Sequence, residues 1–274
     1  METVYYNVDE ISFRYDHHRE AVKKLVTLFE NNDQVIALVF GGSVAKKMER
    51  PDSDIDGMVI VTEEYFEERK SRNRTAECIF ACDYPGGYFD VKYMTKGFIM
   101  DAANKASEPT RNSFIGSKVL FTRDPDIPEI ICRIPVFQEQ ETEDKMLSFY
   151  SSLCLNYRYF WKCCHPEGYM KIRVAAEVVY CLYRMVLQEN KILFPCNRRL
   201  EEYVMKAPEK PEHLVEDCRM FCETMEEQYI ERAITSWKEW TKYDYQTAEP
   251  AAESRYCEDY EQWWRVPRPL VNEW

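Results

Sequence analysis

The sequence predicts an α+β protein, in which an N-terminal domain with a sheet and flanking helices precedes a C-terminal all-α helical bundle. Short β-branched and aromatic runs bounded by turn residues dominate residues 34–122. Beyond Pro128 and Pro135 the apolar residues recur at helical spacing instead. A chain of 274 residues, 45% of them hydrophobic, is long enough for two cores, so we expect domains at residues 1–135 and 136–274.

In the first domain, a helix and a buried strand are expected to lead into the sheet. Residues 19–30 carry apolar side chains on one side, which is the pattern of an amphipathic helix. Residues 36–40 form an uninterrupted apolar run, which is typical of a buried strand. A helix near residues 96–106 and a strand over residues 118–122 are expected later in this domain.

A tight bend of small residues follows the strand at 36–40. Gly41 and Gly42 allow the backbone to turn sharply, and Ser43 is expected to open a short helix over residues 44–48. Amides at the start of a helix have no partner within the helix and attract phosphate. We therefore expect these three residues to form a phosphate cradle.

A pair of acids, Asp54 and Asp56, begins the next apolar segment after ten intervening residues. Successive side chains of a strand point to opposite faces, so the two carboxylates should share one face while Ile55 enters the core. Two oxygen ligands would then face the same space.

A third carboxylate, that of Asp90, lies in a predicted hairpin. Residues 79–81 and 88–94 are rich in β-forming residues, and residues 83–87 between them have strong turn chemistry. Asp90 shares a face with Lys92, whereas the aromatic and β-branched neighbours share the other face. An acid on so apolar a strand needs a partner, and a metal ion would serve.

Magnesium is the ion expected at these three aspartates. Carboxylates about 4 Å apart repel by roughly 4 kcal/mol per pair at an effective dielectric constant near 20, and divalent cations would reverse this repulsion. Mg²⁺ favours a few carboxylates together with phosphate oxygens from a substrate. We therefore expect Asp54, Asp56 and Asp90 to be metal ligands.

These motifs resemble the nucleotidyltransferase superfamily built on the DNA polymerase β palm. Its pattern is Gly-Gly or Gly-Ser, a short spacer, then Asp, a hydrophobic residue and Asp or Glu, which Gly42, Ser43, Asp54 and Asp56 match. A later strand of that superfamily often supplies a third acid, and Asp90 lies in such an element. Gly57 departs from the family, which usually has a hydrophobic residue at this position.

The resemblance implies a polymerase β-like palm domain, which is a mixed sheet with flanking helices, and a specific reaction. Two Mg²⁺ ions would support transfer of a nucleoside monophosphate, expected to be AMP, from ATP or another nucleoside triphosphate to an acceptor hydroxyl, with release of pyrophosphate. Asp54 and Asp56 would hold the ion bound to the triphosphate and share a second ion with Asp90. Gly41, Gly42 and Ser43 would bind the phosphates.

The C-terminal domain is expected to contain several long amphipathic helices. Helical periodicity covers residues 139–164, 169–189, 197–206 and 212–243. The tail at residues 245–274 contains three tryptophans, which suggests that it packs onto the body of the protein: Trp263, Trp264 and Trp274.

This domain resembles, more weakly, the helical half of aminoglycoside adenylyltransferase-like members. Glu177 lies among Ala and Val residues, where it could serve as the base for the acceptor hydroxyl or form an ion pair with Arg173. Asp90 is the alternative base. Arg198 and Arg199 stand where a basic residue near the nucleotide is expected, but a solvated helix start explains them as well.

The charge of the chain narrows the expected partners. A net charge of −12 argues against a duplex nucleic-acid binder, which would carry a basic face. A small-molecule acceptor fits better, and an aminoglycoside-like antibiotic is one candidate because an acidic surface attracts polycations. Two alternatives stay open: a protein or tRNA acceptor, as in antitoxin-like members, and a non-catalytic nucleotide sensor.

Other sequence features indicate a cytoplasmic protein that does not span a membrane. No apolar run approaches the ~20 residues that cross a bilayer, and the first ten residues contain no basic leader. Eleven scattered cysteines without zinc-like spacing suggest reduced thiols. His17 and His18 lie in a polar stretch and are expected at the surface.

Overall fold

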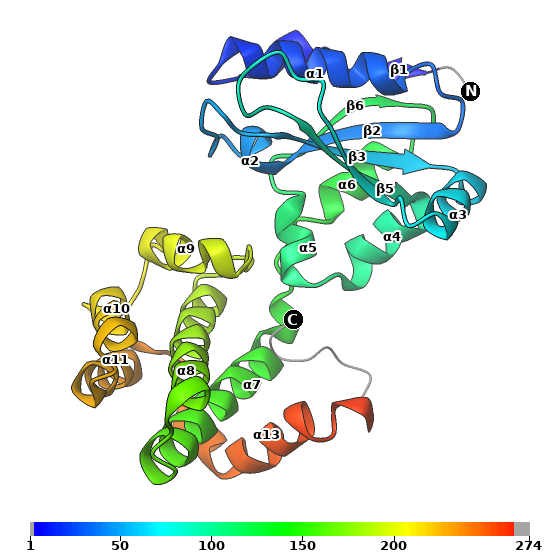
Figure 1. Ribbon diagram of the computed structural model, residues 1–274. Helices are drawn as coiled ribbons and strands as arrows, with labels where there is room; N and C mark the ends of the chain where they lie inside the picture. Colours follow the sequence, from blue (N-terminus) through cyan, green and yellow to red (C-terminus); the bar gives the residue numbers. More distant parts are fainter. Residues whose placement is uncertain (1–2, 266–274) are drawn as a thin grey trace. The chain divides into compact units, whose positions relative to one another are not determined.

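The computed structural model describes residues 3–265. The chain divides into two compact units, residues 1–136 and residues 137–274, and each is described by itself (Figure 1). Among the described residues, no helix is both long and apolar enough to cross a lipid bilayer.

The first unit is built on a six-stranded mixed sheet, as predicted. Its strand order is β1-β6-β2-β3-β5-β4, in which β3 and β5 are parallel and the other neighbours are antiparallel. The predicted hairpin is present as β4 and β5, but β4 ends at Ile79, where the predicted first strand begins. The strands are β1 (Val4–Tyr5), β2 (Val35–Gly41), β3 (Ile55–Val61), β4 (Ala76–Ile79), β5 (Phe89–Thr95) and β6 (Lys118–Thr122).

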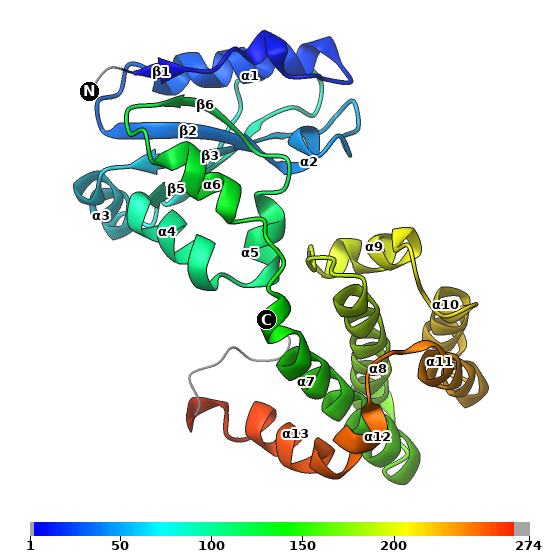
Figure 2. The ribbon, with the colours of Figure 1, turned by 180° about the vertical axis from the view of Figure 1, so that it is seen from behind.

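Helices cover both faces of this sheet. Helix α1 lies on one face, and α4 and α6 lie on the other, as the two opposite views show (Figures 1 and 2). The helices are η1 (Val8–Glu10), α1 (Asp16–Phe29), α2 (Gly42–Ala45), α3 (Glu63–Ser71), α4 (Lys96–Lys105), α5 (Glu108–Ser113) and α6 (Ile127–Arg133).

Three of these helices, α3, α5 and α6, are absent from the elements expected from the sequence. Helix α3 has only two apolar residues, Tyr65 and Phe66, which are partly buried against the core, so it shows no repeating apolar stripe. In α6, Pro128 occupies the first turn, where a missing N–H costs nothing, and so it begins the helix rather than ending it.

The two faces of the sheet bury different sets of side chains because strand residues alternate. On β3, Ile55 and Val59 pack in the cluster on the α1 face, whereas Met58 and Ile60 pack in the cluster on the α4 and α6 face. Gly57 belongs to the α1 face, where a Cβ atom would lie 3.3 Å from Leu25 Cδ2. The close approach of α1 therefore explains why a glycine replaces the expected hydrophobic residue.

His18 lies in the core of the first unit, so the prediction that it is a surface residue is wrong. Helix α1 begins at Asp16, three residues before the predicted start, and this extension puts His18 one turn before Val22 on the buried face. The imidazole has no exposed surface, and burial lowers its pKa. Its ring lies 5.2 Å from the ring of Tyr84.

The described residues of the second unit form helices joined by loops, with no strand. The predicted segment 212–243 is two helices separated by Met225, whose φ of 57° is left-handed. The elements are η2 (Glu139–Glu141), α7 (Thr142–Cys154), the π-helix η3 (Leu155–Cys163), α8 (Gly168–Glu189), η4 (Asn197–Arg199), α9 (Leu200–Lys206), α10 (Leu214–Thr224), α11 (Glu227–Trp240), α12 (Tyr245–Ala248), η5 (Glu249–Ala251), α13 (Ala252–Tyr260) and η6 (Trp263–Arg265).

The tail packs against the helical unit, but not through its tryptophans. Arg255 on α13 is buried, and its guanidinium donates to the carboxylate of Asp144 and the hydroxyl of Ser148 on α7. Trp263 and Trp264 are 51% and 69% exposed, which contradicts the expectation that they anchor the tail. Trp274 lies outside the described residues. The anchor is therefore an arginine network.

Candidate metal centre

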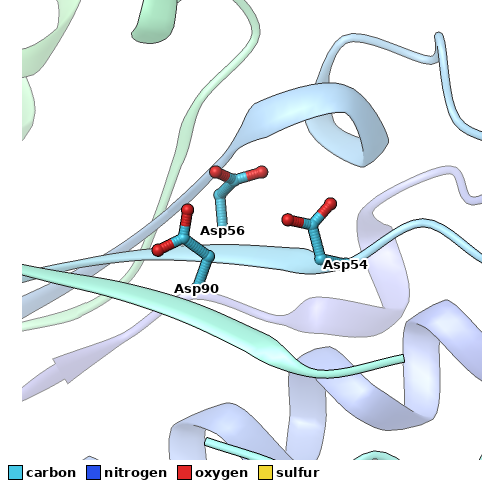
Figure 3. Close-up of side chains that lie close together, drawn as sticks. All are labelled: Asp54, Asp56 and Asp90. Carbon is cyan, nitrogen blue, oxygen red and sulfur yellow. The ribbon is translucent and has the colours of Figure 1, made fainter. Parts of the chain in front are cut away.

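Three aspartates of the first unit converge on one point. Asp54, Asp56 and Asp90 each offer a carboxylate oxygen, and these atoms lie within 4.8 Å of one another. All three side chains extend from the same side of β3 and β5 (Figure 3). Such a group could hold a metal ion.

The sheet register brings these carboxylates together. Asp56 and Asp90 are direct partners in the parallel pairing of β3 with β5. Asp54 comes two residues before Asp56, so it points to the same face. The sequence predicts that Asp54 and Asp56 lie on one face of a strand. The pairing of β3 with β5 adds Asp90 to that face.

The glycine bend lies directly beside Asp56. Gly41 is the last residue of β2 and pairs with Asp56 across the antiparallel ladder. Gly42 has a φ of 72°, and a Cβ atom on it would lie 1.6 Å from Asp56 Oδ2. Only glycine fits here, because any other residue would meet both a left-handed backbone and the carboxylate.

The short helix after the bend differs from the prediction. Helix α2 spans Gly42–Ala45, so it begins before Ser43 and ends earlier than the predicted residue 48. A helix of four residues has little macrodipole. Any attraction for phosphate at Gly42 and Ser43 therefore depends on individual N–H groups and the Ser43 hydroxyl rather than on a helix dipole.

The electrostatics of the site favour a cation. Burial, together with the negative charges of Asp54 and Asp90, raises the pKa of Asp56 to about 6. The side chains of Asp56 and Asp90 are 25% and 29% exposed, so the site remains open to solvent and to ions. A bound cation would remove the repulsion that raises this pKa.

Two lysines of the site were not recognised as site residues from the sequence. Lys92 Nζ lies 2.8 Å from Asp90 Oδ2 and 3.8 Å from Asp56 Oδ1. Lys46 follows α2, and its charge also lowers the pKa of Asp56. Lys92 lies two residues after Asp90, so the sequence already places it on the same face of the strand. Lys46 is brought near the aspartates only by the fold.

An exposed aromatic pair lies beside the triad on the hairpin. The rings of Phe80 and Tyr88 are 5.7 Å apart, and Phe80 is 84% exposed. The negative charge of Asp54 and, less strongly, burial raise the pKa of the Tyr88 hydroxyl, which places this ring next to the candidate ligand.

Glu177, a candidate base, is held inside the helical unit. Its Oε1 accepts hydrogen bonds from Tyr260 at 2.9 Å and from Ser152 at 3.2 Å. Arg173, the ion-pair partner named in the alternative reading, lies 4.0 Å from its other oxygen. The side chain is 8% exposed, and these contacts match a structural acid.

The two candidate nucleotide-binding arginines lie in η4 of the helical unit. Arg198 is exposed, as a solvated helix start predicts. Arg199 Nη1 lies 3.3 Å from Glu202 Oε2, one turn along the chain.

Comparison with solved structures gives a distant likeness. The chain is similar to the crystal structure of a nucleotidyltransferase-like protein from Exiguobacterium sibiricum 255-15, with 10% sequence identity and a TM-score of 0.45, over 91% of this chain and 81% of that chain. Similarity at this level establishes neither a shared family nor a shared activity. No protein-family model and no curated protein matches the sequence.

Proposed function

We propose that this protein is a Mg²⁺-dependent nucleotidyltransferase of the DNA polymerase β superfamily. It would transfer a nucleoside monophosphate from a nucleoside triphosphate to an acceptor hydroxyl and release pyrophosphate. The observation that carries the proposal is the convergence of three aspartates, with oxygens within 4.8 Å, beside the Gly42–Ser43 bend.

The donor set suits magnesium. It consists of carboxylates alone, and burial, together with the charges of Asp54 and Asp90, raises the pKa of Asp56. Asp54 and Asp56 would hold the ion that accompanies the triphosphate, and Asp90 would join them around a second ion. Bound there, Mg²⁺ would polarise the phosphate and acceptor oxygens and offset the charge that develops during transfer.

The residues of the bend would hold the triphosphate. Backbone N–H groups of Gly42 and Ser43 and the Ser43 hydroxyl are donors suited to the β- and γ-phosphates. Lys46 lies a few residues further along, and its ammonium would balance part of the phosphate charge. The leaving pyrophosphate would then lie on the β2 side of the triad.

The acceptor would approach from the other side. In-line displacement requires the attacking hydroxyl to stand opposite the leaving group. Strands β3 and β5 lie between β2 and β4 in the sheet, so the side opposite the bend carries the aromatic pair Phe80 and Tyr88. We therefore place the acceptor there, with Asp90 as the carboxylate that receives its proton.

For the substrates, we propose AMP as the transferred group and a small-molecule acceptor. The net charge of −12 supports a cationic small molecule, such as an aminoglycoside-like compound, over duplex nucleic acid. ATP labelled in its α-phosphate tests the acceptor class, because transfer to protein or RNA would favour the antitoxin-like alternative.

The central experiment measures pyrophosphate release across a panel of nucleoside triphosphates and acceptors. Asp54→Asn should reduce turnover by about a thousandfold or more, because it removes a ligand that acts on the transition state. Asp52→Asn is the matched control, since Asp52 lies in the same loop but forms an ion pair with Arg50 outside the triad. Equal turnover in wild type and Asp54→Asn would refute the proposed mechanism.

The binding-only alternative gives a different result. A sensor would bind a triphosphate with Mg²⁺, and the Asp54→Asn variant would lose this binding, but no acceptor would yield pyrophosphate. Calorimetric titration of the triphosphate with and without Mg²⁺ therefore separates the sensor from the enzyme.

A further inference from the structure

The loop that delivers Asp54 is held by side chains from two distant parts of the chain. His17 Nε2 lies 2.9 Å from the carbonyl oxygen of Pro51. The hydroxyl of Tyr84 donates to the carbonyl oxygen of Ser53 at 2.7 Å. Ser53 is itself buried, and its Oγ accepts from the backbone N–H of Arg50 at 2.9 Å.

The contact from Tyr84 bears directly on Asp54. The carbonyl of Ser53 belongs to the planar peptide bond that joins it to Asp54, so fixing this oxygen also fixes the backbone nitrogen of Asp54. Asp54 precedes β3, whose paired residues begin at Ile55. The sheet holds the peptide after Asp54, because Ile55 N donates to the carbonyl oxygen of Tyr88 at 2.9 Å. The loop holds the peptide before Asp54, and Tyr84 acts on that side.

Tyr84 is positioned closely by its own surroundings. Gly87 leaves room for the ring, because a Cβ atom there would lie 2.4 Å from it. The ring centroid lies 4.5 Å from that of His17 and 5.2 Å from that of the fully buried His18. The ring is therefore packed on several sides, which holds its hydroxyl close to the Ser53 carbonyl.

We propose that Tyr84 is a positioning residue for Asp54, and that its hydrogen bond to Ser53 sets the ligand geometry of the metal centre. The inference rests on the proposed function, since it assumes that Asp54 binds a divalent cation. Groups that orient metal ligands affect metal affinity without touching the ion. Loss of the hydroxyl should therefore weaken metal binding more than it weakens the fold.

The chain supplies a matched control in Tyr93. Its hydroxyl donates to Glu77 Oε1 at 2.6 Å, so Tyr93→Phe also removes one phenolic hydrogen bond in the same hairpin. Tyr93 packs in the cluster on the α1 face, and its hydroxyl bonds to Glu77 of β4 rather than to the loop of Asp54. A purely structural role predicts that Tyr84→Phe and Tyr93→Phe behave alike.

The test is Mn²⁺ binding to the full chain, followed by electron paramagnetic resonance, together with thermal unfolding without metal. Tyr84→Phe should weaken Mn²⁺ binding by about tenfold, whereas Tyr93→Phe should bind Mn²⁺ as the wild type does. Gly87→Ala displaces the Tyr84 ring and should weaken Mn²⁺ binding in the same way, which provides a second variant should Tyr84→Phe fail to fold.

The outcomes separate this inference from the proposed function. Wild-type affinity in Tyr84→Phe and in Gly87→Ala would overturn the positioning role and leave the metal centre intact. Equal weakening of Mn²⁺ binding in Tyr84→Phe and Tyr93→Phe would show general destabilisation. This result would also overturn the positioning role. A wild-type protein that binds no Mn²⁺ would overturn the metal centre and the positioning role together.

Discussion

Gly42 and Asp56 approach so closely that a Cβ atom on Gly42 would lie 1.6 Å from Asp56 Oδ2. The bend proposed to hold phosphate and a carboxylate proposed to hold metal are thus packed against each other. Because both features occupy one small volume, a change in either should disturb the other.

Gly42→Ala tests this coupling. The new methyl group would displace the bend or the Asp56 carboxylate, and the φ of 72° adds backbone strain. We expect Mn²⁺ affinity and triphosphate affinity to fall together, each by about tenfold or more, in titrations of the purified protein. Gly97→Ala is the control, since the nearest atom to its Cβ lies 3.5 Å away. Loss of one affinity without the other would contradict the coupling.

The raised pKa of Asp56 predicts how stability depends on pH in the absence of metal. The folded protein binds this proton more tightly than the unfolded chain does, with pKa values of about 6 and 3.8. The resulting stabilisation is therefore complete below pH 3.8 and is lost as the pH rises through about 6. Two pKa units correspond to at most about 3 kcal/mol.

Asp56→Asn should remove this contribution, which denaturant unfolding between pH 4 and 7 would measure. Asp124→Asn is a control of opposite sign: burial opposes the charge of Asp124, but Lys96 outweighs burial and lowers its pKa. The stabilisation that the ionised Asp124 carboxylate contributes is lost as the pH falls through its lowered pKa. Identical pH profiles for wild type and Asp56→Asn would show that Asp56 titrates normally.

The ammonium group of Lys92 lies beside the carboxylates of Asp56 and Asp90, where a metal ion would also bind. The Lys92 ammonium lies 2.8 Å from Asp90, and although burial opposes its charge, the Asp90 carboxylate raises its pKa. Lys92→Met should tighten Mn²⁺ binding several-fold, because the metal no longer competes with this charge. The control Lys105→Met removes an exposed lysine paired with Asp101. Weaker Mn²⁺ binding in Lys92→Met would contradict the competition.

Phe80 tests where the acceptor binds. Phe80→Ala should raise the KM of the acceptor several-fold and leave the KM of the triphosphate unchanged, because the ring lies on the side opposite the bend. Stability should change by less than about 0.5 kcal/mol, since this side chain is 84% exposed. Phe98→Ala, at 46% exposure on α4, is the matched control. A raised KM for the triphosphate alone would place the nucleotide there instead.

Glu177 distinguishes a structural acid from a catalytic base. Glu177→Gln weakens the hydrogen bonds from Tyr260 and Ser152, so we expect a loss of about 1–2 kcal/mol in unfolding free energy with unchanged kcat. Glu216→Gln, at an exposed position of α10, should leave both quantities unchanged. Collapse of kcat at wild-type stability would instead assign the base role to Glu177.

Local patterns along the chain were sufficient to predict much of the site. Alternation within one strand places Asp54 and Asp56 on one face, and turn residues predict the hairpin that carries Asp90. Helix α3 was missed because its two partly buried aromatic residues form no repeating stripe. Helix α6 was missed because Pro128 suggests a break, although its isoleucines have helical spacing. The burial of His18 was missed since it depends on where α1 begins.

The sequence by itself determined strand segments, the glycine bend and the shared face of Asp54 and Asp56, because these depend on the two-residue period of strands and on backbone chemistry that acts over a few residues. The order of the strands and the parallel pairing of β3 with β5 belong to the tertiary structure. Only the tertiary structure brings Lys92 and Lys46 close enough to lower the pKa of Asp56 in part, packs Leu25 against Gly57, and places the Tyr84 hydroxyl on the Ser53 carbonyl. These relations join segments far apart in the chain, and the register of the sheet and the packing of α1 bring them together.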